Sequence, residues 1–147
     1  MKCVILAAGR GDRLVGKDGA KPLFPLLGLP LLERAILTAA GAGVTEFSVV
    51  TGHRAAQVEA FLAEVQLRRS LRITAVRNEA WETGNGTSLL AARPFVDGES
   101  FVLLMATHVV GPAMLEKLVA EPLGDGEVIL AVDSRLGRNE ASTQPRR

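Results

Sequence analysis

Residues 2–14, KCVILAAGRGDRL, join a short apolar run to a glycine-rich loop, and this junction decides the fold. Residues 2–7 have the length and the apolar character of a buried strand. Gly9 and Gly11 would let the backbone approach a phosphate, and the guanidinium of Arg13 would donate to its oxygens. The sequence therefore predicts a phosphate-binding loop after the first strand, which we favour over a simple tight turn.

Apolar runs of strand length alternate with stretches of helical period along the chain. Strands that are apolar on both faces are typical of a covered parallel sheet. Strands are predicted over residues 2–7, 47–52, 71–76, 101–106 and 127–132. Helices are predicted over residues 31–42, 54–64, 87–92 and 112–121. This alternation predicts an α/β domain, a Rossmann-like three-layer sandwich with a mainly parallel central sheet.

The composition changes near the end of the chain. Residues 1–132 are expected to form one core, because 147 residues is the length of a single domain and no linker interrupts it. Residues 133–147, DSRLGRNEASTQPRR, are polar and lack an apolar period, so we expect a disordered tail. Because the chain stops soon after a predicted core strand, we expect the core to be incomplete and the chain to be truncated.

Charge and cysteine content exclude several classes of protein. The formal net charge of +1 is far from the basic excess of a nucleic-acid-binding protein, so we expect no nucleic-acid partner. Four arginines form a local cluster that we interpret as a solvated connection from helix to strand: Arg68, Arg69, Arg72 and Arg77. Cys3, the single cysteine, has no disulfide partner, which favours the cytoplasm. No apolar run is long enough to insert into a membrane.

Two other kinds of phosphate-binding loop do not fit the letters. A dinucleotide fingerprint needs a third glycine where Leu14 stands, followed directly by a helix. A P-loop needs a hydroxyl side chain after its lysine, where Asp18 follows Lys17. Lys21 is more informative, because it stands beside Pro22 and can return to the phosphates above the glycine loop as a point charge.

Three motifs together carry a family resemblance. LAAGRGDRL (6–14), KPL (21–23) and GLPLLERAI (28–36) resemble the signature of the nucleotidyltransferase superfamily, which condenses a nucleoside triphosphate with a phosphorylated sugar, polyol or alcohol. The resemblance implies that Arg13 and Lys21 hold the triphosphate as pyrophosphate leaves. It also places the first loop against the nucleotide, through Leu6, Ala7, Ala8, Gly9 and Gly11.

A second region narrows the resemblance. NEAWETGNGTSLLAA (78–92) and FVLLMATHVV (101–110) are similar to the inositol-1-phosphate cytidylyltransferases, which implies CTP as the nucleotide and a phosphorylated polyol or amino alcohol as the acceptor. On this likeness four residues face the nucleotide: Asn78, Gly84, Asn85 and Ser88. For Asn85 two interpretations stay open, a left-handed turn residue or an amide that reads the edge of cytosine.

The resemblance also implies Mg²⁺, and here the sequence departs from the family. Relatives carry a metal-binding aspartate after the fourth core strand, but this chain has Thr107, a neutral and poor substitute. Asp133 is interpreted as a turn residue. Metal binding is therefore doubtful, and two functions remain: an enzyme, or a catalytically impaired relative that binds nucleotide as a regulatory or interaction module. A transferase that uses another nucleotide and a sugar 1-phosphate differs from the first only in substrate.

Other polar and aromatic residues receive structural interpretations. Asp12 is favoured as a turn or cap residue, and His53 as structural or solvent-facing. Trp81 could stack on a ligand or cover the edge of a loop. Glu33 and Arg34 lie on an amphipathic helix and are expected to be solvated.

Overall fold

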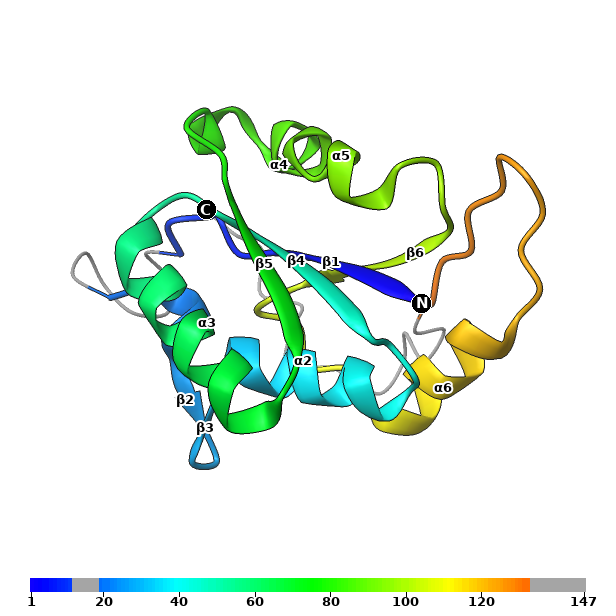
Figure 1. The fold of residues 1–147 in the computed structure, drawn as a ribbon, viewed down its shortest axis with the longest axis horizontal. Helices are drawn as coiled ribbons and strands as arrows, with labels where there is room; N and C mark the ends of the chain where they lie inside the picture. The colour runs from blue at the N-terminus through cyan, green and yellow to red at the C-terminus, as the bar shows by residue number, and fades with distance from the viewer. Residues whose placement is uncertain (12–18, 133–147) are drawn as a thin grey trace, which may run out of the picture.

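Four parallel strands form the central sheet of the computed structural model, which describes residues 1–11 and 19–132 (Figure 1). They are β1 (Lys2–Leu6), β4 (Glu46–Thr51), β5 (Arg72–Arg77) and β6 (Phe101–Met105), in the order β5-β4-β1-β6. Ile5 in the central strand lies opposite Val49 of β4 and Leu104 of β6. The predicted parallel sheet is confirmed.

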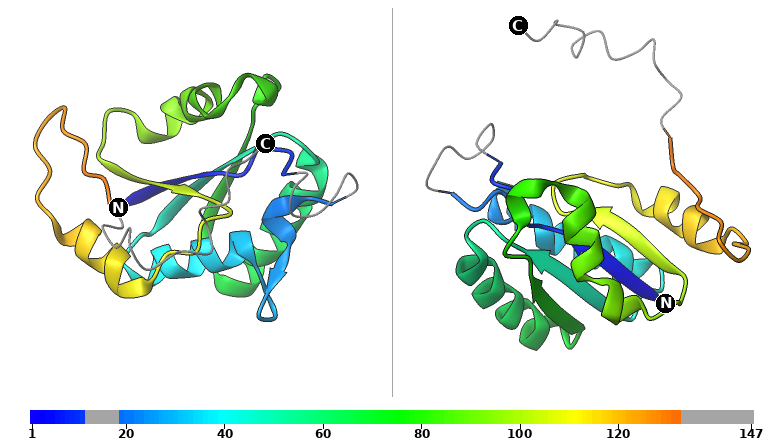
Figure 2. Two further views of the ribbon diagram at one scale, coloured as in Figure 1. Left: turned by 180° about the vertical axis from the view of Figure 1, so that it is seen from behind. Right: turned by 90° about the horizontal axis from the view of Figure 1, so that it is seen from above.

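Helices cover both faces of this sheet, as Figure 2 shows from two further sides. One face carries α2 (Leu31–Gly41), α3 (Ala55–Arg69) and α6 (Pro112–Ala120), and the other carries α4 (Asn85–Ala91) and α5 (Arg93–Val96). Short elements complete the connections: η1 (Lys21–Leu23), β2 (Pro25–Leu26), β3 (Leu29–Pro30) and η2 (Trp81–Thr83). The three-layer α/β architecture is therefore confirmed. None of the helices in the described ranges is long and apolar enough to cross a membrane.

Side chains from the two faces of β1 pack into two separate apolar cores. Cys3 and Ile5 pack with the layer of α2, α3 and α6, whereas Val4 and Leu6 pack with the layer of α4 and α5. Full burial of such a side chain stabilises the fold by about 1.5–3 kcal/mol. Burial also raises the pKa of the Cys3 thiol to about 12, so this cysteine stays protonated and unreactive at neutral pH.

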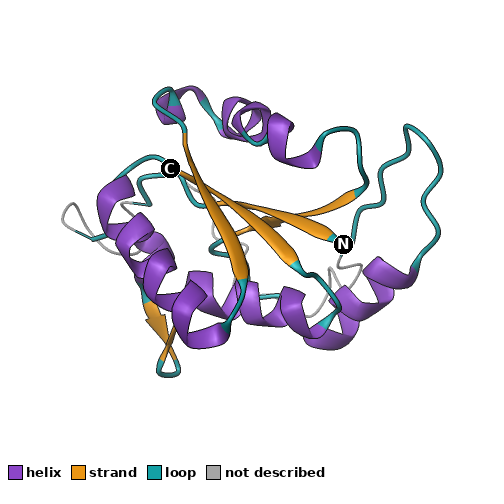
Figure 3. Ribbon diagram, in the orientation of Figure 1, coloured by secondary structure: helices purple, strands orange, loops and turns teal. Residues whose placement is uncertain are grey.

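The strand predicted over residues 127–132 is wrong. Figure 3 draws the chain after α6 as a loop, and Val128, Leu130 and Val132 are each more than three-quarters exposed. An apolar run indicates a preference for burial, but a strand also needs a neighbouring strand to accept its backbone hydrogen bonds. In the described part of the chain β6 stays an edge strand of the sheet, and residues 127–132 do not pair with it.

Two expectations about α2 and α3 also need correction. α3 continues to Arg69, so Arg68 and Arg69 lie in the helix and not in a solvated connection. Glu33 on α2 is not solvated: its side chain is 2% exposed, and its oxygens accept from Arg68 Nη2 at 3.2 Å and Arg69 Nη2 at 3.0 Å. The physical reason is that a carboxylate is buried only when it is paired, and the helical period alone does not indicate that a partner comes from another helix.

A tight hairpin precedes α2. Its two turn residues, Leu27 and Gly28, both have positive φ angles, of 52° and 77°, between the antiparallel strands β2 and β3. Glycine adopts this conformation freely, but a leucine there is strained. The Leu27 side chain is 92% exposed, so its packing does not offset the strain.

Candidate functional site

The segments that follow the sheet strands converge at the carboxyl edge of the sheet (Figure 1). Backbone hydrogen bonds join them: Ala7 N to Val50 O at 2.8 Å, His53 N to Ala8 O at 2.9 Å, Asn78 N to Thr51 O at 2.9 Å and Ala106 N to Leu6 O at 3.0 Å. Ligands of open α/β sheets bind at this edge. The predicted glycine loop therefore lies where a phosphate site is expected.

Gly11 and Lys21 are brought into direct contact. Gly11 has a φ angle of +73°, and a Cβ atom at this position would overlap the Cβ and Cδ atoms of Lys21. The lysine side chain thus runs across the glycine loop. Lys21 is the first residue of η1, and Pro22 next to it is buried. The proximity of these two residues matches the spacing argument from the sequence. Arg13, the other predicted phosphate ligand, lies outside the described residues, as do Asp12 and Asp133.

The other predicted residues of the first loop differ in exposure. Leu6, Ala7 and Ala8 are buried, so their side chains belong to the core. Gly9 is exposed, and a Cβ atom there would meet no other atom within 4 Å. Gly9 therefore has open space in front of it, in which a ligand can approach the backbone.

Asn78 and Ser88 stabilise the loop of residues 78–88, which we call the second loop, from its buried side. Both are buried, and Asn78 Nδ2 donates to Ser88 Oγ at 3.0 Å and to Thr87 Oγ1 at 3.3 Å. Asn78 Oδ1 accepts from the backbone N–H of Ala80 at 3.0 Å. The polar atoms of Asn78 are thus engaged within the protein, and this network closes the loop over residues 78–88.

Gly84 and Asn85 stand on the outside of the same loop. Gly84 has the positive φ angle, of 116°, while Asn85 is the first residue of α4 and is exposed. The interpretation of Asn85 as a left-handed turn residue is therefore wrong, because Gly84 takes the unusual conformation and leaves Asn85 helical. The Asn85 amide is exposed at the mouth of the loop.

A carboxylate on α3 supports this edge, and no spacing in the sequence indicated it. Glu59 accepts from Thr51 Oγ1 at 2.8 Å and from Arg77 Nε at 3.1 Å, which links the last residues of β4 and β5. The hydrogen bond from Arg77 lowers the pKa of Glu59, and the one from Thr51 lowers it further. The ends of the two strands that lead into the site are therefore held by one ionised group.

Four side chains form what we call the aromatic corner: Arg10, His53, Trp81 and Glu82. The Trp81 and His53 rings lie 5.4 Å apart at 58°, and the Arg10 guanidinium lies 5.4 Å from the Trp81 ring. Trp81 thus covers the edge of the loops, one of its two predicted roles, and His53 is half-buried against it. Arg10 and Glu82 are functional candidates that sequence reasoning missed, since a 72-residue separation hides their ion pair.

The position where the family resemblance implies a metal ligand is occupied by Thr107. Thr107 lies half-buried just after β6, beside Ala106, whose N–H bonds to β1. Within residues 1–11 and 19–132, no group of three His, Cys, Asp or Glu side chains could hold a metal ion. Mg²⁺ prefers carboxylate oxygens, and the Thr107 side chain does not supply one.

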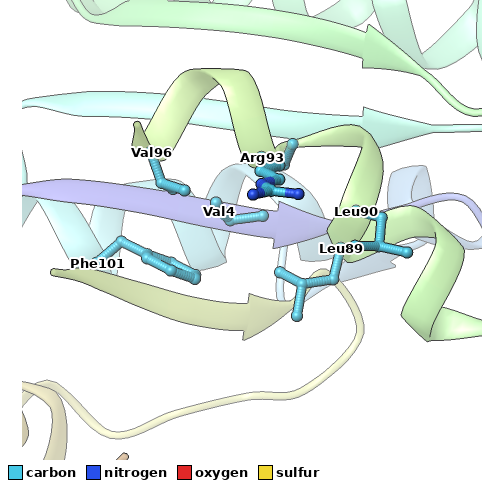
Figure 4. A pocket seen from close by; sticks show the side chains of 7 residues that line it. Val4, Leu89, Leu90, Arg93, Val96 and Phe101 are labelled. Atoms are coloured by element: carbon cyan, nitrogen blue, oxygen red, sulfur yellow. The ribbon is translucent and has the colours of Figure 1, made fainter. Parts of the chain in front are cut away.

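A hollow of about 210 Å³ lies away from this edge, between the sheet and the layer of α4 and α5 (Figure 4). It is lined by Val4, Leu89, Leu90, Ala92, Arg93, Val96 and Phe101. Arg93 is the one charged side chain in this lining, so the hollow lacks the donors that a triphosphate needs.

Known proteins are similar to this chain in sequence. The chain is 38% identical over 132 residues to the bifunctional IPC transferase and DIPP synthase of Rubrobacter xylanophilus, covering 89% of this chain and 28% of that protein. The protein of the same name from Archaeoglobus fulgidus is 37% identical over 119 residues, covering 81% of this chain and 23% of that protein. The chain thus spans about a quarter of the length of these two relatives.

A solved structure has a similar fold. The inositol-1-phosphate CTP transferase from T. maritima superposes with a TM-score of 0.69 at 23% identity, over 83% of this chain and 49% of that one. This likeness supports the three-layer fold. Residues 3–143 match the MobA-like NTP transferase domain over nearly the whole chain. The chain therefore belongs to the MobA-like NTP transferase family, as the glycine loop and the motifs around Lys21 and Asn78 indicated.

Proposed function

We propose that this domain transfers CMP from CTP to a phosphorylated polyol, sugar or amino alcohol and releases pyrophosphate. Membership of the NTP transferase family supports nucleotidyl transfer in general. The choice of CTP is supported by the two relatives named as IPC transferases and by the resemblance of residues 78–92 to cytidylyltransferases.

The contact between Lys21 and Gly11 is the observation that carries the proposal. It sets a cationic side chain across a glycine loop at the carboxyl edge of a parallel sheet. A phosphate above Gly9 can receive backbone N–H donors from the loop and the charge of Lys21 from the side. Arg13 is proposed as a second cation at this triphosphate site.

The second loop is proposed to receive the nucleoside. Asn85 is exposed at its mouth, and an amide can both donate to and accept from the edge of cytosine. Asn78 and Ser88 act from beneath, because their hydrogen bond keeps the loop in shape. The backbone of Leu6, Ala7 and Ala8, at and just after the end of β1, is proposed to lie against the nucleoside.

The proposed reaction is a direct displacement. An oxygen of the acceptor phosphate forms a bond to the α-phosphorus of CTP, the bond from that phosphorus to the bridging oxygen breaks, and pyrophosphate leaves with the electron pair. Two polyanions must be brought together, so positioning and charge stabilisation are the main tasks. Lys21 and Arg13 serve the second task by stabilising the charge that develops on pyrophosphate.

A transfer assay tests this proposal. Pyrophosphate release is measured with CTP, UTP, GTP and ATP, each combined with inositol 1-phosphate, glucose 1-phosphate or phosphocholine. We expect release to require both substrates and to be fastest with CTP. Fastest release with another nucleotide would replace CTP in the proposal and favour the sugar 1-phosphate transferase. Binding of CTP without release would favour the second candidate function.

That second candidate is a nucleotide-binding module without turnover. Thr107 favours it, because this neutral side chain stands where the family resemblance implies a metal ligand. Titrations of CTP with and without Mg²⁺ should then show little gain from the metal, whereas Thr107→Asp should restore a gain of about tenfold, or about 1.4 kcal/mol. An equal effect of Mg²⁺ on both proteins would show that position 107 is not a metal position.

Further proposals concern the compartment and the partners of the protein. A cytoplasmic location is supported by Cys3, which is free and buried. The proposed partners are the nucleotide and a small phosphorylated acceptor, and the near-zero net charge does not favour a nucleic acid.

A further inference from the structure

Trp81 of the aromatic corner packs against residues that follow β1 and β4. Gly52 follows β4, and a Cβ atom there would lie 2.5 Å from Trp81 Cβ and 2.9 Å from Ala8 Cβ. The base of the indole, Gly52 and Ala8 thus lie in one packed layer at the ends of β1 and β4. Only a glycine at position 52 leaves room for Trp81, so the position of the indole is built into the sheet.

Arg10, which lies over the indole, is held loosely. Arg10 lies over the ring and pairs with Glu82 at 3.0 Å, but the side chains of Arg10 and Glu82 are 51% and 66% exposed. Exposed ion pairs and exposed cation–π contacts are weak and are readily exchanged for better partners. Arg10 can therefore leave the indole at little cost.

A polar atom beside the indole also lacks a partner. Nε2 of His53 is buried and has no hydrogen-bond partner in the described part of the chain. A buried nitrogen without a partner is unfavourable, so this atom can gain a hydrogen bond if nucleotide binding moves the side chains that cover it. The corner is therefore able to rearrange when a ligand binds.

We propose that Trp81 is the surface on which the nucleobase stacks, and that Arg10 occupies this surface until nucleotide binds. This inference rests on the proposed nucleotide-binding function. Stacking of a base on an aromatic side chain is stronger than an exposed cation–π contact, so the base displaces the guanidinium. Arg10 belongs to the glycine loop itself, so on leaving the indole it joins the phosphates, where its charge finds an anionic partner.

Fluorescence tests this directly, because the chain has a single tryptophan and no tyrosine. CTP should quench the emission of Trp81 with the same midpoint that calorimetry gives for binding. Tripolyphosphate, which carries the charges without the base, serves as the control. Equal quenching by tripolyphosphate and CTP would mean that the departure of Arg10 alone causes the signal, and would overturn stacking.

Substitutions test the role of the Trp81 indole separately from that of the Arg10–Glu82 ion pair. Trp81→Leu should weaken CTP binding about tenfold or more, and Trp81→Phe, which keeps a ring, should weaken it less. Glu82→Gln frees Arg10 and should tighten binding about twofold to fivefold, whereas the matched control Glu79→Gln, an exposed carboxylate three residues earlier, should leave it unchanged.

Two results would overturn the inference in different ways. If calorimetry gives the same CTP affinity for the wild type, Trp81→Leu and Trp81→Phe, the base does not stack on Trp81, while the proposed function stands. If the wild type binds no CTP, both fail. Should Trp81→Leu not fold, as judged by circular dichroism, Trp81→Phe and Glu82→Gln still decide the question.

Discussion

Gly11→Ala tests the geometry of the phosphate loop. The new Cβ would stand in a left-handed conformation, at a φ angle of +73°, which costs about 1–2 kcal/mol for a residue other than glycine. It would also overlap Lys21 at its Cβ atom, which the backbone holds in place, so the loop or η1 must shift. We expect a loss of about 2–3 kcal/mol in the free energy of unfolding.

Binding should fall together with stability in this variant. A charged contact to a phosphate contributes about 1.5–3 kcal/mol, so displacement of Lys21 should weaken CTP binding about tenfold or more. The matched control is Gly98→Ala, because Gly98 has a φ angle of +79° but a Cβ atom there meets nothing within 4 Å. Urea denaturation and calorimetry measure both quantities.

The stability and the CTP affinity of Gly11→Ala are compared with those of Gly98→Ala. Gly98→Ala should show the cost of the backbone conformation alone, with CTP affinity unchanged. Equal losses of stability in the two variants, with wild-type CTP affinity in Gly11→Ala, would refute the idea that Gly11 makes room for a phosphate-binding Lys21.

Three further predictions concern stability. Glu33→Gln should lower the free energy of unfolding by about 2 kcal/mol in urea, since it weakens the three charged hydrogen bonds from Arg68 and Arg69, and Arg68→Ala should cost less because Arg69 remains. Leu27→Asn should raise it by about 1 kcal/mol, because asparagine tolerates the left-handed turn; a loss would show that the exposed leucine is not strained. The carboxyl pKa of Glu59 is lowered in the folded state, so its stabilisation is present above the pKa of the unfolded chain and disappears as the pH falls through the folded-state pKa. Glu59→Gln should therefore flatten the acid side of the curve of stability against pH, and an unchanged curve would contradict this role.

The layered fold was predictable because the strands of an α/β sheet are short apolar runs separated by helical periods. Residues 2–7, 47–52, 71–76 and 101–106 each overlap an observed strand. The run over residues 127–132 satisfies the same pattern and still forms no strand, because an apolar composition does not specify a pairing partner and this run pairs with neither edge strand of the sheet. Glu33 illustrates the same limit, since its burial depends on two arginines more than thirty residues away.

The candidate site was predictable where neighbours in sequence are also neighbours in space. The contact between Lys21 and Gly11 joins two parts of a single loop region, and the spacing indicated it. The contact between Arg10 and Trp81 joins loops after β1 and β5, so it requires the order of strands in the sheet, which local patterns do not provide. The Glu59 contacts to the ends of β4 and β5 require the same knowledge.

The most direct test of the central claim is the affinity of CTP for Lys21→Gln. The claim is that a nucleoside triphosphate binds at the carboxyl edge of the sheet, with Lys21 on its phosphates. Calorimetry compares the wild type, Lys21→Gln and the control Lys117→Gln, which removes an exposed lysine from α6. Lys21→Gln should bind CTP at least tenfold more weakly, while Lys117→Gln binds it like the wild type; equal affinity in all three proteins would contradict the claim.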